Sequence, residues 1–244
     1  MKDNKAYQLG YQNLIFEDKL RKYRMKYLVD YLSTIKASKI LEVGCGNDPI
    51  FLNYDNFEVM DIVEPGELFY EFTKNKIAGD QRISIQNCLL EESKLELKND
   101  YDVIVLGGFL HEIENPEEVL SVVKKIAKPE TIVLTYVPNA NSFHRLLAFE
   151  SGIIKSHFEF SENDKIFGRT CVFTTESVGK LFTNSGFEVV KKETYFIKPF
   201  THQQMDDLLN LPFFTKEILQ GLFRMTKYMP DMGCEIFVSA RVAY

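Results

Sequence analysis

Two histidines come shortly after predicted strands, where a side chain can reach a bound substrate. His111 follows an apolar run and the pair Gly107-Gly108, and His144 lies in a polar segment that follows another apolar run. Imidazole titrates near neutral pH, so it suits a general base that removes a proton from a hydroxyl group. His111 and His144 are therefore the candidate catalytic residues, and a structural or substrate-orienting role remains open for His111.

A glycine-rich turn follows the apolar run that begins at Lys39. Gly44 and Gly46 permit positive φ angles and close approach of backbone to a ligand. Asp48 suits the N-cap of a helix and Pro49 suits its first position. This stretch predicts a buried parallel strand, a ligand-cradling turn and a helix, and an ordinary strand-to-helix turn is the alternative.

An acidic residue ends the next predicted strand, which runs from Phe57 to Glu64. A carboxylate about 20 residues beyond a glycine turn is placed to accept hydrogen bonds from both hydroxyls of a ribose. Pro65-Gly66 and a helix to about Ile77 follow it. Glu64 is the candidate ribose ligand, and a charge that merely favours the helix N-terminus is the alternative.

Strands and helices alternate through most of the chain, which predicts a mainly parallel sheet covered on both faces. A helix before Lys39 leads into the first strand, and its charged residues, Arg24 among them, are expected to face solvent. Further strands are predicted at 82–87, 103–106 and 131–137, and helices at 116–128 and 175–184. Long strands at 187–197 and 234–243 are expected to end the sheet as an antiparallel pair.

The chain is predicted to consist of an N-terminal helical part, 1–36, and one domain, 37–244. Two insertions, at about 138–174 and 199–233, interrupt the alternation. We expect them to form a cap that shapes a substrate pocket, because open α/β sheets bind ligands at the carboxyl ends of their strands. Additional core or a contact between two copies is the alternative for the second insertion.

The run Glu42-x-Gly44-x-Gly46 resembles motif I of the class I S-adenosylmethionine-dependent methyltransferases. The last glycine of that motif is Asp48 here. The resemblance implies a Rossmann-like fold with a mostly parallel seven-stranded sheet, an antiparallel C-terminal strand and helical cap insertions. It also implies S-adenosyl-L-methionine as cofactor and S-adenosyl-L-homocysteine as product, with no metal.

The same resemblance implies the residues of the binding sites. The cofactor-binding candidates are Glu42, Gly44, Cys45, Gly46, Asn47, Glu64, Asn87, Cys88 and Gly107. Asn87 is expected beside the adenine, where its amide oxygen can accept from the amino group. The substrate-binding candidates are Asn139, Asn141 and Arg145, of which Arg145 can pair with a phosphate or carboxylate or form an internal salt bridge.

Polar runs after the fifth predicted strand and near Lys198 resemble a bacterial methyltransferase subgroup associated with surface-saccharide and sugar-nucleotide gene clusters. This implies O-methylation of a small sugar, sugar nucleotide or phosphorylated metabolite in cell-surface polysaccharide biosynthesis. An NAD-dependent oxidoreductase is one alternative, although the third glycine of the dinucleotide fingerprint is absent. A protein that binds the cofactor without catalysis is another.

The composition limits the partners. The 244 residues carry a formal net charge of −6, which argues against nucleic-acid binding because that depends on neutralising phosphates. No apolar run approaches the roughly 20 residues that span a membrane, and the N-terminus does not resemble a signal peptide. The four cysteines are scattered and suggest no metal site. We expect a cytoplasmic enzyme with a small-molecule substrate, with a homodimer as an open alternative to a monomer.

Overall fold

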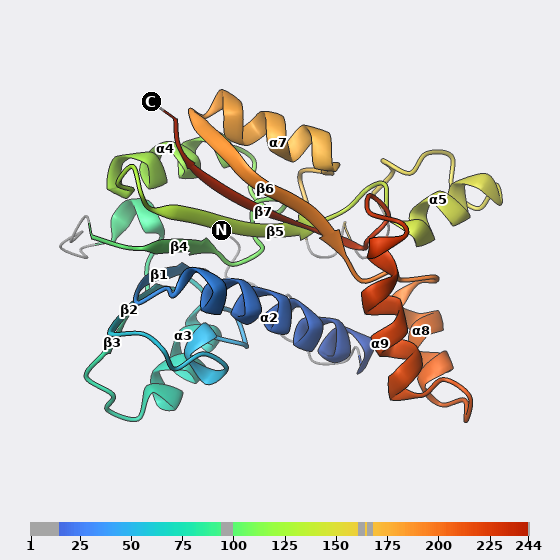
Figure 1. Cartoon of the computed structure of the whole chain (residues 1–244), viewed down its shortest axis with the longest axis horizontal. Coiled ribbons are helices and arrows are strands. Elements are labelled where there is room, and N and C mark those ends of the chain that lie inside the picture. Colours follow the sequence, from blue (N-terminus) through green and yellow to red (C-terminus); the bar gives the residue numbers. More distant parts are fainter. Residues whose placement is uncertain (1–14, 94–99, 161–163, 165–167, 244) are drawn as a thin grey trace.

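The computed structural model describes residues 15–93, 100–160, 164 and 168–243, so the first fourteen residues of the predicted N-terminal helical part lie outside the described residues. The described chain forms a seven-stranded sheet in the order β3-β2-β1-β4-β5-β7-β6 (Figure 1). The strands are β1 (Lys39–Val43), β2 (Val59–Val63), β3 (Ile83–Gln86), β4 (Val103–Leu106), β5 (Ile132–Pro138), β6 (Phe187–Tyr195) and β7 (Glu235–Val242).

The strand directions confirm the predicted fold class. Strands β1 to β5 pair in parallel, and β7 runs antiparallel between β5 and β6. The central parallel strands are almost continuously apolar, as expected for strands buried on both faces. This is the Rossmann-like arrangement with an antiparallel C-terminal strand that the sequence predicts.

Helices cover both faces of the sheet. The helices are α2 (Ile15–Ile35), α3 (Glu67–Ile77), α4 (Pro116–Ile126), α5 (Phe143–Glu150), α7 (Thr175–Asn184), α8 (His202–Leu209) and α9 (Lys216–Arg224). Short 3-10 turns occur at η2 (Ile50–Leu52), η3 (Leu90–Glu92) and η4 (Met225–Lys227). The apolar sides of the helices form two buried clusters with the sheet, one on each of its faces.

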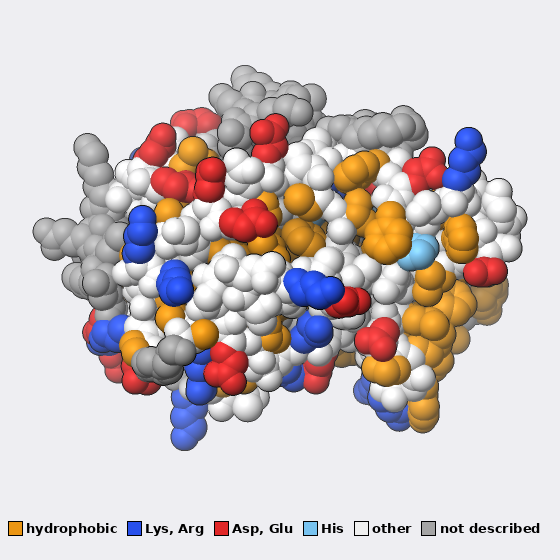
Figure 2. Space-filling view, turned by 90° about the horizontal axis from the view of Figure 1, so that it is seen from above, with side chains coloured by type: hydrophobic (Ala, Val, Ile, Leu, Met, Phe, Trp, Pro, Cys, Tyr) orange, Lys and Arg blue, Asp and Glu red, His pale blue; other side chains and the backbone are white. Residues whose placement is uncertain are grey.

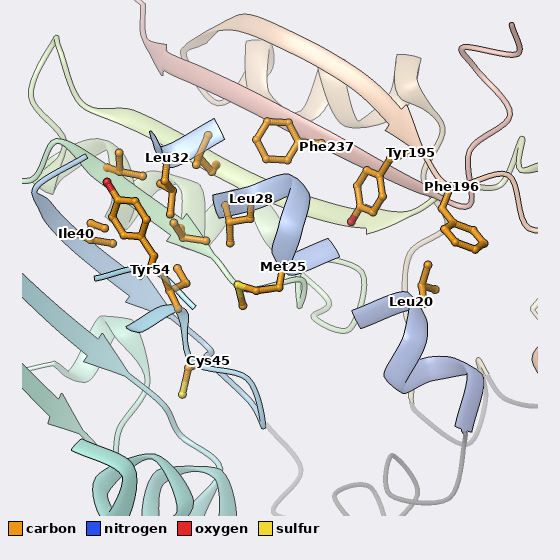
Figure 3. Close-up of a cluster of buried hydrophobic side chains, with 14 of the residues drawn as sticks. Leu20, Met25, Leu28, Leu32, Ile40, Cys45, Tyr54, Tyr195, Phe196 and Phe237 are labelled. Carbon is orange, nitrogen blue, oxygen red and sulfur yellow. The ribbon is translucent and has the colours of Figure 1, made fainter. Parts of the chain in front are cut away.

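Helix α2 fills the first cluster, in which Leu28 and Leu32 pack among side chains that include Ile40 and Phe237 (Figure 3). Helices α4 and α7 fill the second cluster with side chains such as Val123. Burial of one large aliphatic side chain contributes about 1.5–3 kcal/mol, so these helices are held mainly by their apolar sides.

The segment after β1 differs from its prediction. We expected Asp48 to cap a helix that begins at Pro49, but the chain makes only the 3-10 turn η2, and Pro49 occupies the position before it. The N–H of Ile50 donates to the Glu42 carboxylate, with 3.1 Å between Ile50 N and Oε2. The buried carboxyl group of Glu42 therefore takes the place of the Asp48 cap.

The two predicted insertions both contribute helices near one end of the sheet. The first carries α5, and the second carries α8 and α9. In Figure 1 these three helices lie together beyond the carboxyl end of β5. Helix α8 also contacts α2, and the Phe16 N–H donates to Asp206, with 2.6 Å between Phe16 N and Oδ1. The second insertion is thus anchored to the N-terminal helix.

Candidate active site

Three predicted site residues lie abreast at the carboxyl edge of the sheet. The last residues of β1, β2 and β4 pair side by side, and Gly44, Glu64 and Gly107 are the residues that follow them. Backbone hydrogen bonds continue beyond the strands, from Gly44 N to the Val63 carbonyl and from Gly107 N to the Val43 carbonyl, both at 2.8 Å. The register of the parallel strands therefore assembles a glycine turn, an acid and a second glycine into one row.

Glu64 holds the glycine turn in place. Its Oε2 accepts from the N–H of Gly46 at 2.9 Å, and its Oε1 accepts from the N–H of Gly66 at 2.8 Å. The carboxylate is only 4% exposed but still lines the cavity at this edge. Burial raises its pKa, while the hydrogen bonds from Gly46 and Gly66 oppose that rise.

The glycines at this edge are required by the protein's own backbone. A Cβ on Gly107 would lie 1.9 Å from the carbonyl oxygen of Gly44, and one on Gly108 would lie 2.3 Å from the ring of Tyr136. Gly44, Gly46 and Gly108 also have positive φ angles. The sequence suggested that these glycines leave room for a ligand. In the structure, the Gly44 carbonyl oxygen occupies the space beside Gly107, and the Tyr136 ring occupies the space beside Gly108.

Glu42 lies under the turn and outside the lining that the described residues give the cavity. Burial raises its pKa to about 8, so the carboxyl group is mostly protonated at neutral pH. Cys45 also packs beneath the turn, with its Sγ 3.3 Å from Thr73 Oγ1, although it reaches the cavity. Its thiol is free, as are those of the other three cysteines. A cofactor role for Glu42 stays a prediction.

Asn47 lines the cavity beside the turn, whereas Asn87 and Cys88 lie outside the lining formed by the described residues. The Asn87 amide donates to the carbonyl oxygen of Glu64 at 2.9 Å, and so ties the end of β3 to the end of β2. The residues after Cys88, Leu89 and Leu90, reach the cavity instead. An adenine contact by Asn87 or Cys88 stays a prediction.

The cavity at this edge has a volume of about 1660 Å³. One part is formed by the glycine turn, Glu64 and the loop after β3. Another part is formed by residues from α2, α5 and the start of the second insertion, among them Arg24, His144 and His202. It is large enough for a drug-sized ligand and a second small molecule.

His111 reaches the cavity from the segment after Gly108 and is 5% exposed. Both ring nitrogens are buried without a hydrogen-bond partner among the described residues, and Nε2 lies 3.6 Å from Glu112 Oε1. Burial lowers the pKa of His111 well below its usual value, and the nearby Arg169 guanidinium adds to this. A neutral imidazole with an unused nitrogen can accept a proton.

His144 lines another part of the cavity, from the first turn of α5. Its Nδ1 is buried and lacks a partner among the described residues. Burial lowers its pKa, and the positive charge of Lys198 lowers it further. The structure therefore brings both candidate bases to one cavity.

A partly buried polar network at the cavity wall is not apparent from the sequence. We predicted that Arg24 faces solvent, but its side chain is only 19% exposed and forms ion pairs with Glu17 and Glu235, the former at 3.1 Å. The guanidinium also lies over the ring of Tyr136, 5.3 Å from its centroid. The prediction for Arg24 is wrong because the helix surface that carries it is covered by the start of β7, a contact that local sequence does not show.

The three substrate-site candidates differ in their surroundings. The Asn139 amide donates to the carbonyls of Asp231 and Gly233, and its Oδ1 accepts from the N–H of Asn141 at 2.9 Å. Asn139 lines the cavity, whereas Asn141 does not belong to the lining that the described residues form. Asn139 thus joins the two insertions, and substrate contacts by either residue stay predictions.

Arg145 lines the cavity but already has protein partners. Its Nε donates to the His157 carbonyl at 2.7 Å, another nitrogen donates to the Glu159 carbonyl, and a third lies 3.5 Å from Asp164. Arg169 pairs with the same aspartate. The internal salt bridge considered for Arg145 is therefore present.

Comparison with known families identifies the fold and its activity. A family model described as a methyltransferase domain matches residues 18–192. The chain belongs to this methyltransferase family. Its methyl donor is S-adenosylmethionine, and this assignment replaces the pyridine-dinucleotide alternative.

Solved structures support the methyltransferase fold at low sequence identity. A SAM-dependent methyltransferase from Thermotoga maritima is 14% identical with a TM-score of 0.59, and 98% of this chain and 99% of that chain are covered. The methyltransferase domain of bacterial CtHen1 is 15% identical with a TM-score of 0.53, over 91% and 100% of the chains. The cyclase SpnF is 14% identical with a TM-score of 0.56, over 91% and 80%. No curated protein matches this sequence.

The residues at the glycine turn fit the methyl donor of this methyltransferase. Gly44, Gly46 and Gly107 leave bare backbone beside the cavity, and Glu64 presents a carboxylate whose oxygens each keep further acceptor capacity. These groups would hold an amino-acid moiety and a ribose. No described group of His, Cys, Asp and Glu residues is arranged to hold a metal ion.

Proposed function

We propose that this methyltransferase methylates an oxygen of a small sugar, sugar nucleotide or phosphorylated metabolite in cell-surface polysaccharide biosynthesis. The observation that carries the proposal is the cavity that joins the glycine turn to His111, whose two ring nitrogens are buried without a described partner. An unpaired polar group in a cavity costs about 1–3 kcal/mol, so a ligand hydroxyl there would form a favourable contact.

The chain's own residues support this reaction in two ways. The bound S-adenosylmethionine supplies a methyl group on a positively charged sulfur. The cavity wall can hold an acceptor in line with that group, and such positioning contributes about 7–11 kcal/mol in favourable cases. A ring nitrogen of His111 is not used by a described hydrogen bond, so it can accept the proton that the acceptor hydroxyl loses. His144 is the second candidate for this role.

The proposal is tested by screening sugar nucleotides and phosphorylated metabolites for release of S-adenosylhomocysteine. We expect His111→Asn to lower kcat at least tenfold while the affinity for S-adenosylhomocysteine changes less than twofold. His157→Asn is the matched control, because this histidine is partly buried outside the cavity. If the protein binds S-adenosylhomocysteine but releases none of it with any of these substrates, the proposed acceptor class is wrong.

A protein that binds the cofactor without catalysis would bind S-adenosylhomocysteine but release none from any acceptor. The acidic composition supports a small-molecule acceptor over a nucleic acid. None of the described helices is long and apolar enough to cross a membrane. A cytoplasmic location stays part of the proposal, and cell fractionation tests it.

A homodimer also stays part of the proposal. Hydrophobic side chains gather at the end of the molecule that holds α5, α8 and α9 (Figure 2). Ile218 and Tyr228, from α9 and the segment after it, are 44% and 70% exposed. Light scattering on the purified chain measures the oligomeric state directly, and a mass of one chain at micromolar concentration would contradict the dimer.

A further inference from the structure

Lys198 is a buried cation that the reaction described above does not use. It follows the end of β6 and lines the cavity, although its side chain is only 4% exposed. Its Nζ lies 3.0 Å from Nδ1 of His202, at the start of α8. The residue that immediately precedes the second insertion is therefore a lysine that lines the cavity.

A second contact of His202, with Glu17, determines whether His202 or Lys198 donates the hydrogen bond between them. His202 Nε2 lies 2.9 Å from Oε2 of Glu17. Although burial alone would raise the pKa of Glu17, Arg24 and His202 lower it to about 2, so Glu17 is a carboxylate and can only accept. His202 Nε2 consequently carries the hydrogen, and Nδ1 offers its lone pair to Lys198.

The ammonium group of Lys198 thus has N–H donors that His202 does not use. An ammonium group has three N–H donors, and His202 takes one of them. Within the described part of the chain, Lys198 has no other hydrogen-bond acceptor in reach and no carboxylate within 4.0 Å. A buried charge without a counterion costs several kcal/mol, so an anionic ligand would be stabilised here.

The neighbouring cations do not offer the same free donors. Arg145 and Arg169 share Asp164, and Arg145 also donates to two backbone carbonyls. Their positive charge nevertheless acts on the same region. Burial lowers the pKa of Lys198 and Arg169 lowers it further, while Cys234 and Glu17 oppose this fall. Nδ1 of His144, in the field of Lys198, is buried without a described partner and leaves a second polar atom for a ligand.

We propose that Lys198, oriented by His202 and Glu17, binds an anionic group of the methyl acceptor, a phosphate or a carboxylate. This inference rests on the proposed function and narrows its substrate class to acceptors that carry such a group. The acceptor hydroxyl would lie toward His111, and its anionic group would lie toward the start of α8.

Calorimetry on the full chain loaded with S-adenosylhomocysteine tests this proposal. Pyrophosphate and malonate serve as the phosphate and carboxylate probes, at constant ionic strength because screening alters ion pairs. We expect one of the two probes to bind, and its affinity to fall at least tenfold in Lys198→Met, which is about 1.4 kcal/mol. Lys198→Arg should retain part of that affinity. Stronger binding of one probe identifies the anionic group.

The control is Lys180→Met, because this lysine is exposed on α7 and pairs with a neighbouring glutamate on the same helix. It should leave probe binding unchanged. Equal probe affinity in wild type and Lys198→Met, or no probe binding by wild type loaded with S-adenosylhomocysteine, would overturn the proposal. Failure of wild type to bind S-adenosylhomocysteine at all would instead contradict the proposed function.

A measurement on the unmodified chain covers the case in which Lys198→Met does not fold. Acetic anhydride labels lysines, and mass spectrometry reports the rate at each position. We expect the probe that binds to slow labelling of Lys198 at least fivefold while labelling of Lys180 is unchanged. Equal labelling of Lys198 with and without saturating probe would overturn the assignment.

Discussion

The Glu64 carboxylate accepts a hydrogen bond from the backbone N–H of Gly46, with 2.9 Å between Oε2 and N. The acid at the end of β2 and the turn after β1 are therefore one unit, although 18 residues separate them. Its other oxygen accepts from the N–H of Gly66, which opens α3. Glu64 thus fixes the shape of the turn in addition to facing the cavity, and its substitution should affect both folding and ligand affinity.

We expect Glu64→Gln to lower the affinity for S-adenosylhomocysteine at least tenfold. The amide keeps one oxygen and places an NH₂ group against one of two backbone N–H donors, which also costs about 1–3 kcal/mol of stability. Calorimetry and urea unfolding measure the two effects. Glu67→Gln, exposed in the first turn of α3, is the control. Equal affinities of Glu64→Gln and Glu67→Gln would refute the role of Glu64.

Gly107 and Gly46 should respond differently to alanine. A Cβ on Gly107 would overlap the Gly44 carbonyl oxygen at 1.9 Å, so we expect Gly107→Ala to cost about 3 kcal/mol of unfolding free energy. A Cβ on Gly46 meets nothing within 4 Å, and its φ of +56° alone should cost about 1–2 kcal/mol. Urea unfolding of both variants compares the two. Similar losses would show that backbone conformation dominates over the overlap.

Arg24→Met should destabilise the fold strongly. The substitution leaves the buried Glu235 and the partly buried Glu17 without their shared cation, and removal of one partner from a buried ion pair costs about 3–5 kcal/mol. Arg21→Met is the matched control on the same helix, because Arg21 pairs with the exposed Asp18 and such surface pairs contribute about 1 kcal/mol or less. A loss for Arg24→Met no larger than that for Arg21→Met, measured by urea unfolding, would contradict the importance of the network.

Glu42 should make the stability decrease as the solution becomes alkaline. Burial raises its pKa to about 8 from 4.5, so the folded state binds a proton that the unfolded state releases between these pH values. Its contribution is fully present below pH 4.5 and is lost as the pH rises through 8. We expect Glu42→Gln, which keeps an acceptor for the Ile50 N–H, to reduce the fall in melting temperature between pH 6 and pH 9. An identical fall in wild type and Glu42→Gln would exclude this assignment.

The local pattern of the chain was enough to predict the sheet and one half of the site. Apolar runs that stop at glycine or an acid indicated where parallel strands end, and their carboxyl ends share one edge, so Gly44, Glu64 and Gly107 were expected together. The family resemblance of the Glu42-x-Gly44-x-Gly46 run added the cofactor. These features could be predicted because each depends on residues that are close together in the sequence.

The other half of the site depends on the tertiary structure alone. Arg24 looked like a surface residue, but it pairs with Glu235, 211 residues away, and its side chain is mostly covered. Lys198 likewise became a site residue through His202 and Glu17, the latter 185 residues from His202. No sequence window contains such pairs, because burial and charge at each position depend on which distant segments pack against it. The sequence by itself therefore determined the alternation of strands and helices and the glycine turn, and packing determined which charges face the cavity.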